Sequence, residues 1–494
     1  MKLAELIKDI EVKEYLNFSD TDITGISADS QSIRRGELFA AVRGHSADGH
    51  DFIKQATDRG AVALVVERSI ETSLPTVIVT NSAVATALMA KRLYNDPASR
   101  VVLVGITGTN GKTSSSFLLR SILNRSVGPT GIIGTVGIGS RETMVATTHT
   151  TPASVDLYRI IADFLGKGCR AVAMEVSSHA ADQDRIAGLE FDVGVFTNIS
   201  RDHLDYHETF ENYLAAKEKF VKTLQQPGRV KEQGILAYNM DDERLVSVAG
   251  RFGGSKVSFG LRSHANVRAE GLEADLRGTR FDLVIGSSRG RVELKLLGVF
   301  SAYNALAAAA AAHALGIDLE DIRAGLEDVA EVPGRFQVVS TGKGPTVVVD
   351  YAHTPDALDR LLRFCRELSP KRIYTVFGCG GDRDRGKRPM MGSIAAELSD
   401  TVFVTDDNPR TEDPDKIVDA ILQGMKGGMG LVHVVRDRRE AIHRAISAAR
   451  EGEMVVIAGK GHEDYQILKD RRVPFSDIKV AMNALKSSEV NYQS

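Results

Sequence analysis

The amino-acid sequence predicts an α/β protein of about three domains, whose parallel sheets carry helices on both faces. Apolar runs of strand length alternate with helical patterns, which is typical of parallel sheets that are buried on both faces. The length of 494 residues corresponds to about three domains of ordinary size. Almost every apolar run ends in polar or glycine-rich residues. Because ligands of open α/β sheets bind beyond the carboxyl ends of the strands, these ends are the candidate functional positions.

The first 98 residues predict a smaller, mixed α/β domain. Its short β patterns are residues 38–42, 61–67 and 75–79. The first sixteen residues show an amphipathic helix pattern that charged residues interrupt. A helical pattern at residues 82–99 closes the segment, and its Asn-Asp-Pro sequence is a helix stop. We therefore place a domain boundary near residue 98.

A different sequence pattern begins at residue 101, where apolar runs alternate with helical patterns. These runs occupy residues 101–106, 169–176, 191–199 and 234–240. A helix-rich stretch follows, and the sequence EVPGRFQ interrupts it at Glu331. A further series of runs then occupies residues 346–353, 372–381, 401–410 and 453–463. The sequence thus predicts domains at residues 1–98, 99–331 and 332–494.

The composition favours a globular protein that stays in the cytoplasm. Hydrophobic residues make up 43%, charged residues 26%, and the net charge is −3, so no basic excess indicates a nucleic-acid surface. No run of about 18 apolar residues occurs that could span a membrane, and the N-terminus lacks the apolar core of a signal peptide. Three scattered cysteines are too few for a disulfide framework or a zinc site.

The segment GITGTNGKTSSS, residues 105–116, predicts a phosphate-binding loop between a strand and a helix. Glycines at 108 and 111 allow backbone N–H groups to curl around phosphate oxygens. Lys112 supplies a point charge, and Thr113 can place its hydroxyl on Mg²⁺. Ile106 occupies the place of the first glycine of the strict motif, so the loop is a variant of it.

Glu175 and His203 follow neighbouring apolar runs and are candidate metal ligands. A carboxylate and an imidazole near Thr113 could bind a divalent cation that also holds nucleotide phosphates. Each of them alone would more often be structural.

Lys217 lies in an apolar stripe of a predicted helix, together with Tyr213, Phe220 and Leu224. Such a lysine is usually a snorkelling side chain at the edge of a buried face. A desolvated lysine instead favours its neutral amine, which reacts with CO₂ to give a carbamate that can ligate a metal. Both interpretations remain open at this point.

Four segments together resemble the Mur ligase family. They are TGTNGKT at residues 107–113, EVSSH at 175–179, HLDYH with the following AAK helix at 203–217, and DNPR at 407–410. The resemblance covers essentially the whole chain, in the expected order and spacing. It implies an N-terminal domain for a UDP-sugar, a central parallel-sheet P-loop-type ATPase domain, and a C-terminal Rossmann-like domain.

The resemblance also implies an ATP-dependent ligase of cytoplasmic peptidoglycan precursor synthesis. The DNPR segment is similar to that of family members that add meso-2,6-diaminopimelate to UDP-N-acetylmuramoyl-L-Ala-D-Glu. The D-Glu carboxylate would take the γ-phosphate of ATP to form an acyl phosphate, which the incoming amine would attack. The resemblance also implies a monomer that uses ATP as a substrate and binds two Mg²⁺ ions.

The resemblance assigns residues to three ligands. The UDP end should meet Ser30, His45, Ser46 and Ala47. The muramoyl-peptide should meet Thr150, Thr151, Ser177, Gln183 and Arg185. ATP should lie on Gly108, Thr109, Asn110, Gly111, Lys112 and Thr113, with Asn304, Arg335 and Asp350 at its adenosine end.

Lys112, Glu175, His203 and Lys217 should be the catalytic group, with Lys217 carbamylated and Mg²⁺ held by Thr113, Glu175, His203 and that carbamate. One departure concerns Ser301, which stands where the family often has a second asparagine. A serine at this position can still donate a hydrogen bond to ATP.

Diaminopimelate should meet Arg383, Asp407, Asn408, Pro409, Arg410, Gly459 and Glu463. Arg410 would pair with the far carboxylate of this amino acid, which lysine lacks. The alternatives within the superfamily are a lysine-adding ligase, which Arg410 opposes, and folylpolyglutamate synthase, which the N-terminal domain and the DNPR segment oppose. A regulatory P-loop NTPase is the alternative from another class, and it leaves Lys217 unexplained.

Overall fold

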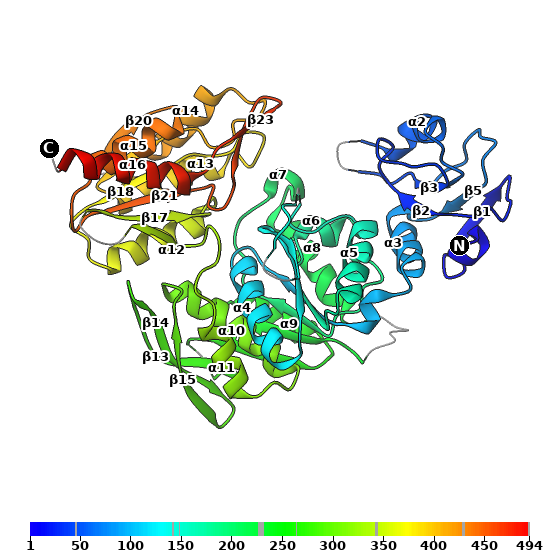
Figure 1. Ribbon diagram of the computed structural model, residues 1–494, viewed down its shortest axis with the longest axis horizontal. Helices are drawn as coiled ribbons and strands as arrows, with labels where there is room; N and C mark the ends of the chain where they lie inside the picture. The colour runs from blue at the N-terminus through cyan, green and yellow to red at the C-terminus, as the bar shows by residue number, and fades with distance from the viewer. Residues whose placement is uncertain are drawn as a thin grey trace.

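The computed structural model describes residues 1–44, 47–140, 143–147, 149–225, 232–262, 264–340, 344–426 and 430–492. Within these residues, three large sheets of five, ten and six strands follow one another along the chain, and a two-stranded hairpin is added near the C-terminus. Figure 1 shows the first and last sheets at opposite ends of the long axis, with the ten-stranded sheet between them. The mixed α/β architecture predicted from the sequence is confirmed, whereas the boundaries at residues 98 and 331 stay predictions.

The N-terminal sheet has the strand order β1-β5-β4-β3-β2, in which β2 to β5 are parallel and β1 is antiparallel to β5. Its region contains α1 (Leu3–Leu6), β1 (Val12–Leu16), β2 (Gly25–Ser27), β3 (Glu37–Ala40), η1 (Gly49–Phe52), α2 (Ile53–Asp58), β4 (Ala63–Val66), β5 (Thr76–Val79), α3 (Ser82–Leu93) and η2 (Pro97–Arg100). The three β patterns form β3, β4 and β5, and the closing helical pattern forms α3.

The prediction of a helix over the first sixteen residues is wrong beyond the first helical turn. The helix α1 ends at Leu6, and residues 12–16 form the edge strand β1. Backbone pairing with β5 outweighs the helical periodicity, because β1 completes hydrogen bonds that the edge of the sheet would otherwise leave open. Leu3 and Leu6 still join the apolar core beside α3.

The central sheet has the order β15-β14-β13-β12-β11-β10-β6-β9-β7-β8. The strands from β13 to β7 in this order are parallel to one another. The elements are β6 (Val102–Thr107), α4 (Lys112–Ser126), β7 (Thr130–Gly134), β8 (Gly137–Gly139), α5 (Ser154–Gly166), β9 (Ala171–Glu175), α6 (Ser178–Asp182), β10 (Val193–Phe196), α7 (Leu204–His207), α8 (Phe210–Thr223), β11 (Ile235–Asn239), α9 (Glu243–Arg251), β12 (Lys256–Gly260), β13 (Val267–Asp275), β14 (Gly278–Ile285), β15 (Ser288–Leu294), α10 (Val299–Ala314) and α11 (Leu319–Glu327).

Helices cover both faces of this sheet, as the alternating pattern predicts. On one face, α4 and α10 pack through residues such as Leu118, Ile122 and Leu306. On the other face, α5 and α8 pack through Leu157 and Phe220. The two faces therefore hold separate apolar cores, and the carboxyl ends of the parallel strands remain free of them.

Both edges of the central sheet are antiparallel, which the sequence pattern did not indicate. Strands β13, β14 and β15 form a meander, and β7 and β8 form a hairpin. Two residues, Leu276 and Arg277, connect β13 to β14. A connection this short cannot contain the crossover helix that parallel strands require, so the strands pair antiparallel.

The C-terminal sheet has the order β16-β17-β21-β18-β19-β20, with only β16 antiparallel. The elements are β16 (Gln337–Ser340), β17 (Thr346–Asp350), α12 (Pro355–Glu367), β18 (Ile373–Phe377), α13 (Lys387–Leu398), β19 (Thr401–Val404), α14 (Pro414–Gly424), β20 (Leu431–Val434), α15 (Arg438–Ala448), β21 (Met454–Ala458), β22 (Tyr465–Leu468), β23 (Arg471–Pro474) and α16 (Asp477–Tyr492). Helices α12 to α14 cover one face and α15 with α16 the other, which is a doubly wound arrangement.

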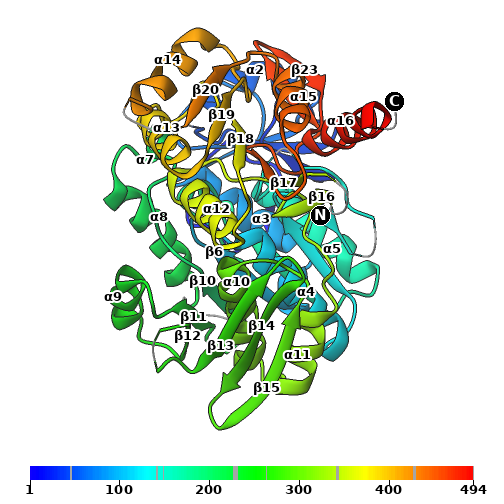
Figure 2. The same ribbon diagram turned by 90° about the vertical axis from the view of Figure 1, so that its left-hand side faces the viewer.

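Polar side chains connect the C-terminal sheet region to the central one. Asn110 Nδ2 donates to Asp356 Oδ2 at 2.8 Å, and Arg201 pairs with Asp384 at 3.4 Å. Figure 2 shows α12, whose first turn contains Asp356, above the strand β6. The loop after β6 therefore lies between two sheets.

Two further sequence expectations concern the surroundings of the chain. Cys169, Cys365 and Cys379 are all buried, and none of them forms a disulfide among the described residues. Among the described residues, no helix combines the length and the apolar character that crossing a bilayer requires.

Candidate active site

A cavity of about 440 Å³ lies between the central and C-terminal sheets, beyond the carboxyl end of β6. It is lined by the loop after β6, by the ends of neighbouring strands, and by the segment that follows β17. The predicted site residues that line it are Thr109, Asn110, Gly111, Lys112, Thr113, Thr150, Glu175, Ser177, His203, Lys217, Asn304, Arg335 and Asp350. Residues from many separate strand ends, helices and loops thus meet in one place.

The phosphate loop has no room for side chains at its two glycines. Gly108 has φ of 143°, and a Cβ there would lie 1.9 Å from Thr197 Oγ1. Gly111 has φ of 87°, and a Cβ there would lie 2.3 Å from Asn304 Oδ1. Both positions require glycine, which leaves the backbone exposed to a ligand, as phosphate binding needs.

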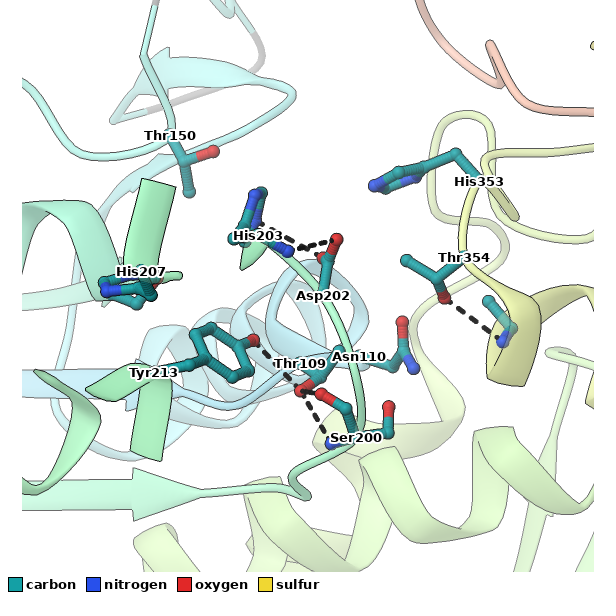
Figure 3. A network of polar contacts seen from close by, with 12 residues as sticks. Thr109, Asn110, Thr150, Ser200, Asp202, His203, His207, Tyr213, His353 and Thr354 are labelled. Carbon is teal, nitrogen blue, oxygen red and sulfur yellow. Dashed lines mark hydrogen bonds and ion pairs between the residues drawn. The ribbon is translucent and has the colours of Figure 1, made fainter. Parts of the chain in front are cut away.

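Thr109 and its neighbours hold this loop in place (Figure 3). Thr109 Oγ1 accepts a hydrogen bond from Ser200 N at 2.9 Å and lies 3.0 Å from the hydroxyl of Tyr213. Tyr213 belongs to α8 and Ser200 to the segment after β10. The loop is therefore braced by two elements that also supply candidate metal ligands.

Lys112 begins helix α4 and folds back over the loop. Its Nζ donates to the carbonyl oxygens of Gly108 and Thr109, each at 2.9 Å. Burial lowers the pKa of Lys112, while Glu175 and Asp202 oppose that shift. The Lys112 amino group is thus hydrogen-bonded to backbone carbonyls, close to where phosphate oxygens would lie.

Glu175 and Thr113 are buried oxygen donors in the cavity. Glu175 accepts hydrogen bonds from the backbone N and the hydroxyl of Thr135, each at 2.9 Å. Thr113 Oγ1 accepts from Arg335 Nη2 at 3.0 Å. Both side chains therefore stand in fixed orientations before any ligand arrives.

His203 lies beside Asp202, with Nε2 3.3 Å from Oδ2 of that carboxylate. Burial lowers the pKa of His203 to about 3, although Asp202 opposes the shift. The imidazole is therefore neutral near pH 7, which is the form that binds metals. His203 also has φ of 54°, a conformation that costs a non-glycine residue roughly 1–2 kcal/mol.

His353 faces Asp202 and His203 across the cavity (Figure 3). Its Nδ1 lies 2.8 Å from the carbonyl oxygen of Tyr351, so Nδ1 is the protonated nitrogen. Burial, with help from the charge of Lys387, lowers the pKa of His353 to about 4. His353 was not among the predicted site residues, although it belongs to the same DYAH segment as Asp350.

Lys217 is buried together with the apolar face of α8. The residue is 1% exposed, and its Nζ donates to the Gly108 carbonyl at 2.8 Å. Nζ also lies 4.8 Å from the ring centre of Tyr213. Burial, together with the charge of Lys112, holds the pKa of Lys217 well below its ordinary value. The snorkelling interpretation is wrong, because this ammonium head does not reach solvent.

The adenosine side of the cavity contains the other predicted ATP residues. Asp350 accepts hydrogen bonds from the backbone N of Phe336 and Ala352, at 2.6 and 2.7 Å. Burial raises the pKa of Asp350, against the opposing charge of Arg335. The Arg335 guanidinium stacks on Tyr351 at 4.5 Å, and its Nε has no hydrogen-bond partner among the residues that the structure describes.

Ser301 also lines the cavity, but its hydroxyl is hydrogen-bonded to the segment just before its helix. Ser301 Oγ donates to the Leu297 carbonyl at 2.7 Å. Asn304, one helical turn further on, keeps its side chain at the loop beside Gly111. The expected contact of ATP with position 301 would therefore require this hydroxyl to turn away from the Leu297 carbonyl.

The residues predicted to bind the muramoyl-peptide form a hydrogen-bonded row that runs from this cavity towards the N-terminal domain. Thr150 Oγ1 lies 3.0 Å from Thr135 Oγ1, and Ser177 N donates to Thr151 Oγ1 at 3.0 Å. Arg185 donates to the Thr151 carbonyl at 2.9 Å and to Gln183 Oε1 at 3.0 Å. Polar groups are thus continuous along this path.

A second cavity of about 430 Å³ lies at the end of this row, between the N-terminal and central domains. Gln183 lines it, together with Arg43 and Gly44 from the N-terminal domain. Ser30 and Ala47 line neither cavity, and Ser30 Oγ donates to Gln55 Oε1 at 2.7 Å. His45 and Ser46 lie outside the described residues.

The residues predicted to bind an amino acid gather around the turn after β19. Arg410 has φ of 53°, and its Nη1 donates to the Gly381 carbonyl at 2.8 Å. Burial lowers the pKa of Arg410, and the neighbouring charge of Arg383 adds to that shift. Among the described residues, neither guanidinium forms an ion pair with a carboxylate. Two adjacent, unpaired arginines make a site for an anion.

Acidic groups complete the same cluster. Asn408 Nδ2 donates to Glu463 Oε2 at 3.0 Å. Gly459 has φ of 117°, and a Cβ there would lie 3.0 Å from Asp407 Oδ2. Burial alone would raise the pKa of Asp407, but Lys460, Arg438 and Arg410 outweigh it and the pKa lies below its ordinary value. Anionic and cationic groups therefore lie side by side in one cluster, which suits a zwitterion.

Comparison with known proteins identifies the family of this chain. Residues 106–312 match the Mur ligase middle domain, residues 334–461 the Mur ligase, glutamate ligase domain, and residues 22–102 the Mur ligase family, catalytic domain. The chain belongs to the Mur ligase family.

Two curated Mur ligases resemble the chain over nearly their full length. Both are named UDP-N-acetylmuramoyl-L-alanyl-D-glutamate–2,6-diaminopimelate ligase. The one from Geobacillus kaustophilus is 40% identical over 98% of this chain and 99% of its own length. The one from Syntrophomonas wolfei is 41% identical over 98% of this chain and 99% of its own length.

Solved Mur ligase structures share the fold. A structure named as the same 2,6-diaminopimelate ligase has a TM-score of 0.68 and 31% identity, and covers 99% of each chain. The MurF ligase of Thermotoga maritima in complex with ADP has a TM-score of 0.64 and 21% identity, over 97% of this chain and 100% of that one. The three-domain architecture of the family is thus confirmed for this chain.

The sequence reasoning missed several groups that support the Mur ligase cavity. Asp202, Thr135 and His353 contact or face the predicted metal and phosphate residues. Asp202 and His353 each stand within a polar strand-end segment, so the strand-end rule could have included them. Thr135 follows a strand that the sequence pattern did not single out, and no local signal marks it.

Proposed function

We propose that the chain joins meso-2,6-diaminopimelate to the D-Glu carboxylate of UDP-N-acetylmuramoyl-L-Ala-D-Glu, at the expense of ATP. The observation that carries the proposal is the pair of unpaired guanidiniums, Arg383 and Arg410, beside Asp407 and Glu463. This set matches an ammonium–carboxylate centre, which diaminopimelate has at its far end. The relatives at about 40% identity are named for the same reaction.

ATP would bind the cavity through the phosphate loop. The backbone N–H groups between Gly108 and Thr113 lie at the start of α4, where the helix dipole favours anions. Lys112 would exchange the carbonyls of Gly108 and Thr109 for phosphate oxygens. Arg335, whose Nε lacks a partner, and Asp350 would meet the nucleotide from the C-terminal side.

Magnesium would be held by Thr113, Glu175, His203 and a carbamate on Lys217, which line the same cavity. Among the described residues there is no group of three or more His, Cys, Asp or Glu side chains poised for a metal. Such a sparse set suits Mg²⁺, which takes one or two carboxylates and completes its shell with water and phosphates. Bound Mg²⁺ would supply neutralisation of the charge on the transferred phosphoryl group.

Lys217 would act after its neutral amine has added to CO₂, a step that releases one proton and leaves an anionic carbamate. Burial supplies the neutral amine, because it disfavours the ammonium. The Gly108 carbonyl, 2.8 Å from Nζ, would orient the remaining N–H of the carbamate. The carbamate would therefore lie beside the phosphate loop.

The reaction would then run in two transfers. The D-Glu carboxylate oxygen forms a bond to the γ-phosphorus, the bond to the β–γ bridging oxygen breaks, and ADP leaves. The amine of diaminopimelate next attacks the acyl carbon, the carbon–oxygen bond to phosphate breaks, and phosphate leaves. Lys112 would offset the gathering negative charge, and closure of the C-terminal domain would exclude water from the acyl phosphate.

Arg410 would choose between diaminopimelate and lysine. A bound lysine would leave this partly buried guanidinium without a carboxylate, which costs roughly 2–5 kcal/mol. A lysine-adding ligase is therefore the weaker candidate. A regulatory P-loop NTPase would need neither the Arg383–Arg410 pair nor the buried Lys217. The cytoplasmic location and the monomeric state stay predictions.

The deciding measurement is phosphate release from ATP with UDP-N-acetylmuramoyl-L-Ala-D-Glu and meso-diaminopimelate, L-lysine or no amine. Release that depends on the UDP-peptide and on diaminopimelate is expected. Equal rates with lysine would retain the ligase and remove the proposed selectivity. Release that ignores both the UDP-peptide and the amine would replace the proposal with a regulatory NTPase.

A further inference from the structure

Lys460 lies behind the predicted amino-acid pocket and was not one of its predicted members. It follows β21 and stands between Gly459 and Gly461, which both have positive φ. Its side chain is 0% exposed. Nζ donates to Asn408 Oδ1 at 3.0 Å and to Glu463 Oε2 at 2.8 Å. A single buried ammonium thus contacts two groups that are predicted to hold the ligand.

These contacts determine which way the Asn408 amide points. Asn408 Oδ1 accepts from Lys460 and also from the backbone N of Ile467, at 2.9 Å. Because Oδ1 serves both donors, Nδ2 is turned towards Glu463 Oε2, 3.0 Å away. Lys460, Asn408 and Glu463 therefore form a closed triangle of hydrogen bonds, in which each member orients the other two.

The neighbouring Arg438–Asp477 pair shows what a purely structural ion pair looks like here. Both of its side chains are 0% exposed, and Arg438 donates to both Asp477 oxygens. The carboxylate paired with Lys460 differs, because the Glu463 side chain keeps 15% of its surface exposed. The triangle is thus buried at its lysine corner and open at the corner that would face a ligand.

Stability alone is a weak reason for such a lysine. A buried ion pair gains little net free energy over well-packed apolar residues, because desolvating both charges offsets their attraction. Orientation of neighbouring polar groups explains this buried lysine better, because a binding site needs its contact groups held within a fraction of an ångström. The electrostatic field of Lys460 also acts on Asp407, a third member of the predicted pocket.

We propose that Lys460 is a positioning residue for the incoming amino acid. It holds Asn408 and Glu463 in the orientation that receives the ligand's ammonium, and it does not itself touch the ligand. The inference rests on the proposed function of the same pocket and names the residue that organises it.

The test replaces Lys460 by Met, which keeps the length of the side chain and removes its charge. The KM for meso-diaminopimelate should rise on the order of 10- to 100-fold, which is the usual effect of losing hydrogen bonds to charged groups. The KM values for ATP and the UDP-peptide should change less than about twofold, because those sites lie elsewhere. Lys469→Met, at the exposed turn between β22 and β23, is the matched control and should leave all three KM values unchanged.

A double-mutant cycle separates orientation from general damage. Lys460→Met and Glu463→Gln should together raise the KM for diaminopimelate by much less than the product of their single effects, because both break one triangle. Lys460→Gln, which retains a donor, should fall between wild type and Lys460→Met. Circular dichroism melting of each variant checks that it is folded.

Three results would overturn the inference. They are an unchanged KM for diaminopimelate in Lys460→Met, multiplicative effects in the cycle, and a parallel rise of the KM for ATP. The wild-type enzyme is measured alongside, and absence of diaminopimelate-dependent phosphate release in it would overturn the proposed function instead, and this inference with it.

Discussion

Lys217 illustrates how the surroundings of one side chain decide its chemistry. On the same helix, Lys219 and Lys222 are exposed, whereas Lys217 is buried beside the Gly108 carbonyl. Burial lowers its pKa well below the ordinary value and so favours the neutral amine. An amine in this state is a nucleophile for CO₂, and the same burial would shield the carbamate that results.

Replacement of Lys217 by Ala should reduce ligase activity at least about 100-fold, because one anionic metal ligand disappears. Short-chain carboxylic acids such as formate should restore part of the activity by occupying the vacated space. The measurement is diaminopimelate-dependent phosphate release with and without formate. Lys222→Ala, on the exposed face of α8, is the control and should behave as wild type in both conditions. Normal activity of Lys217→Ala without formate would contradict a carbamate role.

Arg410 is the second residue whose role depends on its setting. Its positive φ costs a non-glycine residue free energy, and the side chain lies next to Arg383 without a carboxylate partner among the described residues. The charges of Asp407 and Glu463 offset part of the repulsion, and the guanidiniums stay available to an anionic ligand. The turn chemistry of Asp-Asn-Pro explains the bend, whereas the two guanidiniums explain why this bend is suited to an amino acid.

Arg410→Ala should lower kcat/KM for meso-diaminopimelate by roughly 30-fold or more, corresponding to about 2–5 kcal/mol, and should change kcat/KM for L-lysine much less. The ratio of the two constants is therefore the quantity to measure. Arg471→Ala, at an exposed position of β23, is the matched control and should leave the ratio as in wild type. An equal loss for both amino acids would mean that Arg410 serves the fold and not selection.

At the scale of elements, the strand–loop–helix unit from β6 to α4 leaves backbone N–H groups open to the phosphates that we propose it binds. Its requirement for glycine is strict, because Gly111 combines a φ of 87° with a neighbouring Asn304 oxygen where a Cβ would lie. The glycine spacing alone predicted this unit correctly. Its bracing by Thr109, Ser200 and Tyr213 could not be predicted, because these residues meet only after the sheet has formed.

Gly111→Ala should cost roughly 1–2 kcal/mol of stability through the left-handed conformation and should lower kcat/KM for ATP on the order of 100-fold through displacement of the loop. Gly250→Ala is the matched control. It lies in the last turn of α9, where a Cβ would meet no atom within 4 Å. This second change should raise the free energy of unfolding by about 0.5–1 kcal/mol and leave ATP turnover unaltered. Urea unfolding and steady-state kinetics check both variants.

At the scale of the whole molecule, two histidines mark the junction of the central and C-terminal domains. Burial, with Lys387 next in effect, lowers the pKa of His353 to about 4. Burial, with Arg335 next in effect, lowers the pKa of His462 to about 4, and His462 Nε2 lies 3.2 Å from the Thr135 carbonyl of the central domain. Asp202 faces the first imidazole and Asp464 the second, and both oppose these shifts.

Stability should therefore decrease on acidification. Between the ordinary histidine pKa of 6.5 and the folded value of about 4, the unfolded chain takes up protons that the folded chain refuses. The free energy of unfolding then falls as pH falls, by at most about 1.4 kcal/mol per pH unit for each histidine. Partial exposure of both side chains makes the real slope smaller.

The measurement is the urea midpoint at pH 7.5 and pH 5.0. Wild type should lose more stability over this interval than a variant carrying His353→Gln and His462→Gln. His264→Gln, at an exposed position, is the control and should keep the wild-type slope. Equal slopes in wild type and the double variant would contradict the assignment of these shifts to the domain junction.

Local patterns were sufficient for much of this protein. Apolar runs located most of the parallel strands, glycine spacing located the phosphate loop, and the position of polar residues after apolar runs located part of the cavity lining. These signals work from sequence because each depends on residues a few positions apart, whose backbone preferences and faces are set by local geometry.

The tertiary structure alone decided the remainder. It made β1 a strand where the local pattern was helical and made both edges of the central sheet antiparallel. It also buried the amino group of Lys217 against Gly108, which lies 109 residues earlier. It also joined Asn110 to Asp356 and Lys460 to Asn408. Contacts of this kind depend on the packing of distant segments, and the low dielectric environment that changes a side chain's pKa exists only once those segments have come together.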